Sequence, residues 1–415
     1  MQKVCLLNLG CKVNQYEIDG ILNSLKGSYE TTTALEFADI YIVNTCAVTQ
    51  EAEKKSRQIL AKIEKVNPDA KIYVCGCASQ NDPQQFLNKK QVEYVIGTYG
   101  KGKIKNNFSN KGNNVVAIPK EYEDDLIATN VRTRGYVKIQ DGCNNYCSYC
   151  LIPYVRGRSR SRKLESIVNE ANLLSKTCKE IVVTGINISD YRIDGKLALG
   201  EVMKALSPVP ARIRLGSIEV NVITDELLAI LKNMPNFCPS FHLSLQSGCD
   251  KVLSEMNRHY TTKEYLSKVN LIRKYFDDPA ITTDLIVGYP TETNKDFENT
   301  LNFIQQVEFS SIHYFAYSSR KGTKAGNLPQ INGTIIAERE AKLKPIVEEM
   351  HNNYLAKFIG KPLDVLVERQ QKDLFVGFSQ NYIKCFIDSE APVGEIVKVM
   401  PVVIYENGLM CKAIG

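Results

Sequence analysis

The sequence of 415 residues has no tryptophan and only four histidines, which leaves little material for a metal site built on imidazole. It also has no apolar run that approaches the roughly 18–20 residues of a membrane-spanning helix. Met1–Leu9 is too short an apolar run for a secretory signal peptide and has no small-residue cleavage site. These absences predict a cytoplasmic protein without a membrane partner.

Cysteine, by contrast, is abundant. The chain has 13 cysteines, and an odd number of thiols in a large intracellular protein argues for metal or catalytic use rather than for a disulfide framework. The net charge of +6 is mild, so it permits a nucleic-acid partner without indicating one. With 44% apolar residues, the chain is large enough for about two to three domains, each with its own core.

Residues 1–125 alternate short apolar runs with charged helical stretches. The apolar runs are rich in β-branched residues, as buried parallel strands are, and they are VCLLNLG, ADIYIVNTC, AKIYVCGC and VEYVIGT. This alternation predicts a small open α/β sheet domain. The polar stretch Pro119–Asn130 has no strong periodicity and is expected to be a linker.

A second series of strands and helices occupies residues 130–357. Its six strand-like runs are RGYVKIQ, EIVVTGI, ARIRLGS, FHLSLQS, ITTDLIVGY and SSIHYFAY, and each except the last precedes a helical pattern. Six strands are too few for the usual eight-stranded closed barrel. We therefore expect a partial (β/α)6 barrel, with a further helix around Arg339–Lys357.

Residues 358–415 contain about five short β-branched runs separated by turns, which predict a small all-β barrel. Barrels of this kind often bind oligonucleotides. From Lys361 onward, however, six basic residues are balanced by seven acidic ones, so the charge gives no support for that use.

The loop DGCNNYCSYC places Cys143, Cys147 and Cys150 within eight residues, directly after the first predicted barrel strand. The active sites of barrel enzymes lie at the C-terminal ends of the strands, which is where this loop is expected. A structural zinc ion or an ordinary iron–sulfur cluster takes four protein ligands. Three thiolates can hold a [4Fe–4S] cluster and leave one iron free for a substrate or cosubstrate. The alternative is a three-cysteine zinc site completed by a distant histidine.

A second group of cysteines lies in the N-terminal domain. Cys11, Cys46 and Cys77 each follow a predicted parallel strand, and loops at that edge of an open α/β sheet converge on one crevice. The three thiolates could hold a second cluster, or they could be ordinary buried cysteines, and spacing alone leaves both interpretations open. Cys75 is expected to point away from Cys77 and to belong to the core, because side chains alternate along a strand.

The spacing of Cys143, Cys147 and Cys150, with the aromatic Tyr149 before the last cysteine, resembles the radical S-adenosylmethionine (SAM) superfamily. When the three N-terminal cysteine motifs and the small C-terminal barrel are considered as well, the chain resembles the methylthiotransferases over nearly its whole length. The stretches CSYCLIPYVRGRSRSR, HLSLQSG, TDLIVGYPTET and FAYSSRKGT are similar to motifs of that family. The C-terminal barrel resembles its RNA-binding TRAM domain.

This resemblance implies two [4Fe–4S] clusters, one on each cysteine triad, and two SAM molecules. Within the family, LGCKVNQYE, NTCAVT and KSRQ resemble the branch that adds a methylthio group at C2 of N6-threonylcarbamoyladenosine at position 37 of tRNA. Sibling branches modify isopentenyladenosine in tRNA or an aspartate of a ribosomal protein. The expected partners are the anticodon stem-loop of tRNA and an electron donor such as a flavodoxin or ferredoxin, and the expected state is a monomer.

Polar residues near the ends of the predicted barrel strands are candidates for SAM contacts, because such positions are often functional. They are Thr184, Asn187, Ser217, Glu219, Gln246 and Asp284, and the resemblance adds Tyr149 of the cysteine loop. Arg258 could pair with the SAM carboxylate or could be a surface arginine.

The run VRGRSRSRK follows the cysteine loop and contains Arg156, Arg158, Arg160 and Arg162. Beside an active site that acts on RNA, these arginines are expected to contact phosphates. Their spacing of two predicts that they share one side of an extended segment. The alternative is a solvated face.

Two other classes of function remain. A different radical SAM enzyme could use the N-terminal cluster only for electron transfer, and participation of Cys75 as a fourth ligand would favour this. A non-catalytic iron–sulfur or zinc protein could bind RNA and leave SAM intact. Neither explains why three-cysteine motifs occur at two separate strand edges.

Overall fold

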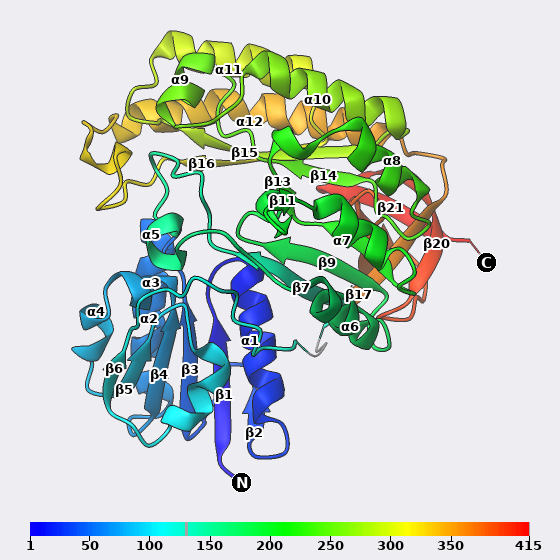
Figure 1. Cartoon of the computed structure of the whole chain (residues 1–415). Coiled ribbons are helices and arrows are strands. Elements are labelled where there is room, and N and C mark those ends of the chain that lie inside the picture. Colours follow the sequence, from blue (N-terminus) through cyan, green and yellow to red (C-terminus); the bar gives the residue numbers. More distant parts are fainter. Residues whose placement is uncertain (129–131, 415) are drawn as a thin grey trace.

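The computed structural model describes residues 1–128 and 132–414, whose elements form three units (Figure 1). The predicted start of the central domain, at residue 130, lies outside the described residues. Residues 119–128, the described part of the stretch expected to be a linker, contain no helix or strand, but they are not fully solvated, because Leu126 and Ala128 are buried against the first unit. No helix in the two described ranges has the length and apolar character that a membrane crossing requires.

The first unit is a parallel sheet with the strand order β2-β1-β3-β4-β5-β6. Its four inner strands are the four predicted ones. The two edge strands were not predicted, since ETT and GNN lack the apolar residues of buried strands. The strands are β1 (Lys3–Asn8), β2 (Glu30–Thr32), β3 (Ile40–Thr45), β4 (Lys71–Gly76), β5 (Val92–Ile96) and β6 (Gly112–Asn114).

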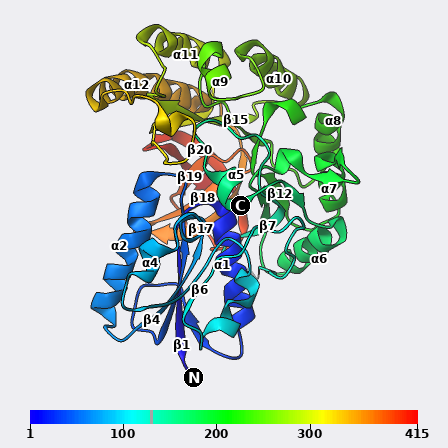
Figure 2. The same cartoon turned by 60° about the vertical axis from the view of Figure 1, so that its left-hand side comes forward.

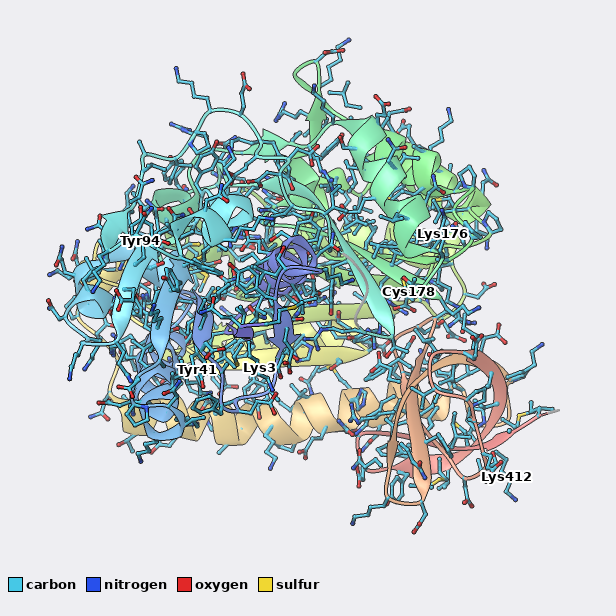
Figure 3. All side chains as sticks on the ribbon, turned by 90° about the horizontal axis from the view of Figure 1, so that it is seen from below. Lys3, Tyr41, Tyr94, Lys176, Cys178 and Lys412 are labelled. Atoms are coloured by element: carbon cyan, nitrogen blue, oxygen red, sulfur yellow. The ribbon has the colours of Figure 1, made fainter. Side chains whose placement is uncertain are left out.

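Helices cover both faces of this sheet, and each face has its own apolar core. Tyr41 belongs to one core and Tyr94 to the other (Figure 3). The helix α2 begins where the Thr49 side chain accepts a hydrogen bond from the Ala52 N–H at 3.1 Å, a typical N-cap. The helices are α1 (Lys12–Leu25), α2 (Gln50–Val66), α3 (Cys77–Asn81), α4 (Gln84–Leu87) and the 3-10 helix η1 (Lys101–Asn107).

The second unit is a partial barrel of six parallel strands, as predicted. The third strand is divided at Gly216: its first part pairs with β9, and its second part pairs with β14. A Cβ at Gly216 would lie 2.8 Å from the Val183 carbonyl oxygen, so only glycine fits where the strand changes neighbours. The strands are β7 (Arg134–Asp141), β9 (Glu180–Gly185), β12 (Arg212–Leu215), β13 (Ser217–Ile218), β14 (Ser240–Leu243), β15 (Ala280–Val287) and β16 (Ser311–Ala316).

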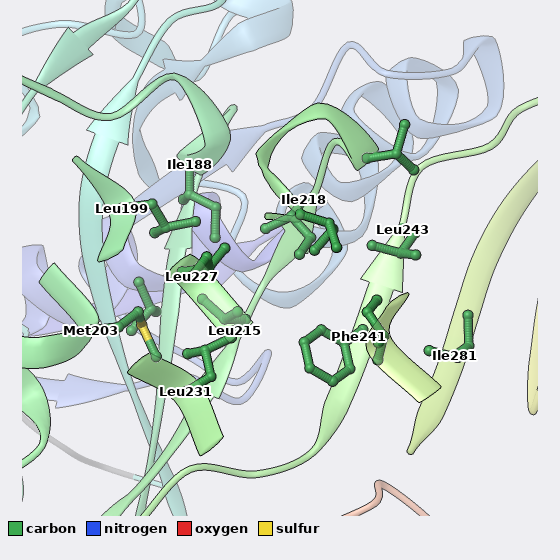
Figure 4. Packing of buried hydrophobic residues seen from close by; sticks show 14 of the residues in the cluster. Ile188, Leu199, Met203, Leu215, Ile218, Leu227, Leu231, Phe241, Leu243 and Ile281 are labelled. Carbon is green, nitrogen blue, oxygen red and sulfur yellow. The ribbon is translucent and has the colours of Figure 1, made fainter. Parts of the chain in front are cut away.

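The outer face of the partial barrel is apolar and is packed by helices. Leu199 and Met203 of α7 and Leu227 and Leu231 of α8 meet strand residues such as Phe241 (Figure 4). Each fully buried side chain of this kind contributes about 1.5–3 kcal/mol of transfer free energy. The outer helices are α6 (Leu164–Leu174), α7 (Leu199–Leu206), α8 (Asp225–Asn233), α9 (Asp250–Glu255), α10 (Thr262–Tyr275), α11 (Asn294–Val307) and α12 (Gly333–Ala356).

The inner face is polar, because side chains alternate along each strand. On β15, Ile281 and Leu285 face the helices, whereas Thr282 and Asp284 are only partly buried. Short elements occur in the connections and were not predicted: β8 (Arg160–Ser161), β10 (Arg192–Ile193), β11 (Lys196–Leu197), α5 (Ile152–Arg156), η2 (Ile188–Asp190), η3 (Val220–Val222) and η4 (Ala325–Asn327).

The first unit closes the open side of the partial barrel. Helix α1 lies against β7 and β9 (Figures 1 and 2). Tyr136 of β7 packs on the core of the first unit, and Lys138 pairs with Glu17 of α1 at 3.1 Å. The amino end of α1 therefore faces the interior of the barrel.

The third unit is a closed five-stranded barrel, as predicted, with the order β17-β18-β19-β21-β20. It lies at the end of the molecule away from Tyr94, where Lys412 is seen in Figure 3. Arg134 and Arg214 of the partial barrel place their guanidinium groups 4.9 and 4.8 Å from the Tyr382 ring. The strands are β17 (Leu363–Gln371), β18 (Leu374–Ser379), β19 (Lys384–Ile387), β20 (Ile396–Tyr405) and β21 (Gly408–Ala413).

Candidate active site: two cysteine triads

The three N-terminal cysteines stand at the carboxyl ends of three adjacent strands. Cys11 is the N-cap residue of α1 after β1, Cys46 follows β3, and Cys77 begins α3 after β4. Cys46 and Cys77 are buried and Cys11 is exposed. Burial, together with the nearby thiols of Cys77 and Cys11, raises the pKa of Cys46 to about 12. The sheet therefore brings the three predicted cysteines together.

Two glycines make this convergence feasible. Gly10 and Gly76 directly precede Cys11 and Cys77, and both have a φ of 113°. A Cβ on Gly10 would lie 2.8 Å from Cys46 Sγ, and a Cβ on Gly76 would lie 2.4 Å from the Thr45 carbonyl oxygen. Since real Cβ atoms do not approach so closely, each glycine is required by both its backbone angle and its neighbours.

Cys75 lies apart from the triad. It is fully buried in β4 and belongs to the core on the α1 side of the sheet, whereas Cys77 belongs to the core on the opposite side. Its Sγ lies 3.6 Å from Asn44 Oδ1. The prediction that Cys75 is a core residue is confirmed.

The central triad lies in one loop after β7. Cys147 and Cys150 line a pocket of about 230 Å³, which Tyr146, Tyr154 and Lys324 also line. Burial raises the pKa of Cys143 to about 11 and that of Cys150 to about 12.

Three of the predicted SAM-binding residues lie at this loop. Asn187 Nδ2 is 3.9 Å from Cys143 Sγ, and Arg258 Nη1 donates to Cys147 Sγ at 3.3 Å. Glu219 accepts a hydrogen bond from Arg258 and another from Asn145 at 3.3 Å. Arg258 is therefore not a surface arginine, since it is 9% exposed.

The other predicted SAM-binding residues are distributed over the barrel. Tyr149 is partly buried beside Cys147 and Cys150, and burial raises its pKa well above the ordinary value. Thr184 is buried near the end of β9, and Ser217 is exposed in β13. Gln246 has a φ of 72° and bonds through its backbone to Asp284, whose carboxylate lies 3.2 Å from His242 Nε2. Their contacts with SAM stay predictions.

The arginine run differs from its prediction. Arg156 ends α5 and Arg160 begins β8, so the run does not form one extended segment. Arg156, Arg160 and Arg162 are 0%, 9% and 3% exposed, and their charges are paired within the protein. The predicted phosphate contacts are wrong for these three residues, because buried and paired guanidinium groups cannot reach RNA. Only Arg158 is exposed, with its guanidinium 5.1 Å from the Tyr146 ring.

Arg156 instead joins the two cysteine sites. Its Nε donates to Cys77 Sγ at 3.2 Å, and its Nη1 donates to Glu17 at 2.8 Å and to Asp141 at 3.2 Å. Asp141 ends β7, two residues before Cys143. No periodicity or spacing in the sequence indicated this contact.

The surroundings of Arg156 contain more positive than negative charge. Four buried cations, which are Arg156, Arg160, Lys101 and Lys138, surround two buried carboxylates, those of Glu17 and Asp141. Although burial opposes it, Arg156 and Lys101 hold the pKa of Glu17 well below its ordinary range. Buried charges are normally compensated, and an anionic ligand at Cys77 would compensate this excess.

The donor sets fit iron–sulfur clusters. Each triad offers three thiols, which as thiolates are the usual ligands of [4Fe–4S] clusters, and each has an arginine N–H directed at one sulfur. Burial raises the pKa of Cys77, and Arg156 opposes that rise. Within residues 1–128 and 132–414, no three His, Cys, Asp or Glu side chains are grouped so as to hold a single metal ion.

Comparisons with known proteins identify the family of the chain. Residues 137–304 match the Radical SAM superfamily, and residues 3–97 match "Uncharacterized protein family UPF0004". The chain is 35% identical to threonylcarbamoyladenosine tRNA methylthiotransferase MtaB of Bacillus subtilis, over 96% of this chain and 93% of that protein. It is 33% identical to tRNA-2-methylthio-N(6)-dimethylallyladenosine synthase of Thermodesulfovibrio yellowstonii, over 95% of both chains.

The fold also resembles that of a solved structure. The radical SAM methyltransferase TsrM from Kitasatospora setae matches with a TM-score of 0.57 at 14% identity, over 78% of this chain and 74% of that one. At that identity the match concerns the fold alone. The full-length match at 35% identity decides the family: the chain belongs to the radical SAM methylthiotransferases, of the MtaB type.

Proposed function

We propose that the protein adds a methylthio group at C2 of N6-threonylcarbamoyladenosine at position 37 of tRNA. The observation that carries this proposal is the full-length match to relatives with that activity in their name, which are 32–37% identical to the chain. The second candidate is the dimethylallyladenosine branch, because a relative with that name is 33% identical.

In this proposal each triad holds one [4Fe–4S] cluster. Cys143, Cys147 and Cys150 would hold the cluster that binds SAM, and Cys11, Cys46 and Cys77 would hold the second one. When bound, SAM and the first cluster supply radical chemistry at the unreactive adenine C2–H bond, and the second cluster supplies sulfur. The protein contributes position and the exclusion of water.

The interior of the partial barrel offers polar groups to the substrate. His242, Asp284 and His313 lie on three neighbouring strands, and the His242 and His313 rings are 6.3 Å apart. Helix α1 lies along one side of this interior. The loop at Tyr382 lies at its other end, beside Arg134 of β7 and Arg214 of β12. In this proposal, a base that enters beside the cysteine loop would meet groups of all three units.

Lys12 favours the threonylcarbamoyl branch. It follows Cys11 at the amino end of α1, and no described residue forms a hydrogen bond or ion pair with its side chain. Its pKa is lowered, first because surrounding atoms reduce hydration of the ammonium and then because Arg134 and Arg214 lie nearby, although Tyr382 and Asp284 oppose the shift. The ammonium therefore lies within reach of the barrel interior, where it could pair with the carboxylate of a threonylcarbamoyl group. A dimethylallyl group offers no such anion.

The mouth of the site has a surface suited to unpaired nucleotides. Tyr146 and Tyr154 meet edge to face at 5.8 Å, and Tyr154 is 53% exposed. Arg158 lies over the Tyr146 ring, and Lys324 lines the same pocket. Exposed aromatic rings beside cations are typical of sites for single-stranded RNA loops. We assign this surface to the anticodon stem-loop, with the C-terminal barrel as a further RNA contact.

The test is mass spectrometry of nucleosides from tRNA of cells that lack the gene. We expect loss of the methylthio group from threonylcarbamoyladenosine, with the parent nucleoside retained. Loss from dimethylallyladenosine instead would establish the second candidate, and unchanged tRNA would contradict both. The electron donor (a flavodoxin or ferredoxin), the monomeric state and the cytoplasmic location are further parts of this proposal.

A further inference from the structure

Arg156 uses all of its hydrogen-bonding capacity inside the protein. Besides its bonds to Cys77, Glu17 and Asp141, its Nη2 donates to Asn14 Oδ1 at 2.8 Å and to Glu17 Oε2 at 3.1 Å. An arginine has five N–H donors, and all five find an acceptor here. The side chain is 0% exposed, so no solvent replaces any of these bonds.

The backbone next to Arg156 holds the other cysteine site. The Cys143 N–H donates to the Gly157 carbonyl oxygen at 3.0 Å. The Arg156 carbonyl oxygen accepts from Arg160 Nη1 at 2.8 Å, which fixes this short segment. One dipeptide, Arg156-Gly157, thus contacts a cysteine of each triad.

We propose that Arg156 is a positioning residue that couples the two cluster sites: it holds the Cys77 sulfur by a charged N–H···S bond and fixes the loop of Cys143 relative to α1. This inference rests on the proposed function, because it assumes that both triads carry clusters. Hydrogen bonds to the sulfur ligands and nearby charge set the reduction potential of an iron–sulfur cluster. Arg156 therefore favours the reduced state of the N-terminal cluster.

The central triad offers an internal comparison. Arg258 donates to Cys147 Sγ and pairs with Glu219, and its other partners, Tyr260 and the Ser244 carbonyl, also belong to the central unit. Arg258 can therefore influence one cluster only. Arg156 differs from Arg258 because its hydrogen-bond acceptors lie in both the first unit (Cys77 and Glu17) and the second unit (Asp141).

Arg162 provides a matched control. It lies in the same run, is 3% exposed and pairs with Asp124 and Glu170, but its hydrogen bonds reach no cysteine. Replacing Arg162 removes a buried ion pair of the same kind and leaves both triads intact.

The experiment isolates the N-terminal cluster in a full-length chain with Cys143, Cys147 and Cys150 changed to Ala. Its midpoint potential is measured by redox titration followed by electron paramagnetic resonance, with Arg156→Gln, Arg156→Lys or Arg162→Gln added. We expect a more negative potential with Arg156→Gln, a smaller shift in the same direction with Arg156→Lys, and no shift with Arg162→Gln.

A potential unchanged by Arg156→Gln, or an equal shift with Arg162→Gln, would overturn the inference. If Arg156→Gln does not fold, Arg156→Lys, which keeps the cation, decides by the same titration. Arg258→Gln in this background is expected to leave the potential unchanged. Failure of the proposed function is recognised separately, since a chain without iron on the N-terminal triad shows it before any arginine is changed.

Discussion

The two cysteine triads present the same number of thiols but are assembled in different ways. The central triad spans eight residues of one loop, whereas the N-terminal triad collects Cys11, Cys46 and Cys77 from the ends of three strands. The first arrangement is local and is encoded by spacing. The second depends on the strand order β1-β3-β4 and on two glycines with positive φ. A local site tolerates changes elsewhere in the fold better than a site that the whole sheet must build.

The sharpest way to separate the two sites is to remove one cysteine from each. Cys11→Ala or Cys46→Ala should abolish methylthiolation of tRNA but leave reductive cleavage of SAM measurable, because the radical chemistry belongs to the other unit. Cys147→Ala should abolish both reactions. The measurements are 5′-deoxyadenosine formation and methylthiolated nucleoside from the same samples.

Cys75→Ala serves as the control in that experiment. Since Cys75 lies in the core on the opposite side of the sheet from Cys77, its variant should keep both activities if it folds. A Cys75→Ala variant that folds but has lost its N-terminal iron would show that the third ligand was misassigned.

The dependence of the N-terminal site on glycine is tested by Gly10→Ala against Gly27→Ala. Both positions have positive φ, so an alanine at either one costs about 1–2 kcal/mol of stability through backbone strain. Only at Gly10 does the added Cβ meet Cys46 Sγ, at 2.8 Å, whereas nothing lies within 4 Å of the Cβ at Gly27. Iron content should fall by about half in Gly10→Ala alone. Equal iron in the two variants would contradict the packing argument.

Lys12 tests whether the N-terminal site also recognises substrate. Lys12→Gln should lower the affinity for tRNA with threonylcarbamoyladenosine by about one to two orders of magnitude, as expected for a charged hydrogen bond worth about 1.5–3 kcal/mol. Affinity for tRNA with unmodified adenosine should stay the same. The exposed Lys71→Gln, at the opposite end of the sheet, is the control. An equal loss of affinity for both tRNAs would mean that Lys12 contacts phosphate.

The smallest expected effect concerns the arginine run beside the central triad. Arg158→Gln should flatten the slope of log affinity for tRNA against log salt by about 0.7, the value for one phosphate of a single strand. Arg162→Gln should leave that slope unchanged but destabilise the fold by about 3–5 kcal/mol, as loss of one partner from a buried ion pair does. A salt slope altered by Arg162→Gln would restore the original prediction for that residue.

The sequence predicted all strands whose residues are apolar and long enough to be periodic. It predicted the third barrel strand as one run, ARIRLGS, because no pattern shows that Gly216 moves the chain to a new neighbour. It placed Cys11, Cys46 and Cys77 at the ends of three predicted strands and Cys143, Cys147 and Cys150 in one loop, where the structure also has them, but their role as cluster ligands came from the family resemblance and stays a prediction. It misjudged the arginines, because a charged run on the surface and a buried network have the same composition. Only the packing of α1 against β7 places Glu17 and Asp141 around Arg156.

The central claim is that the chain carries two separate clusters, and iron and sulfide counts after anaerobic reconstitution test it most directly. The unmodified chain should bind about eight irons and eight sulfides, four for each triad. Changing Cys143, Cys147 and Cys150 to Ala should leave about four, and changing Cys11, Cys46 and Cys77 to Ala should leave the other four or so. About four irons in the unmodified chain would contradict the account.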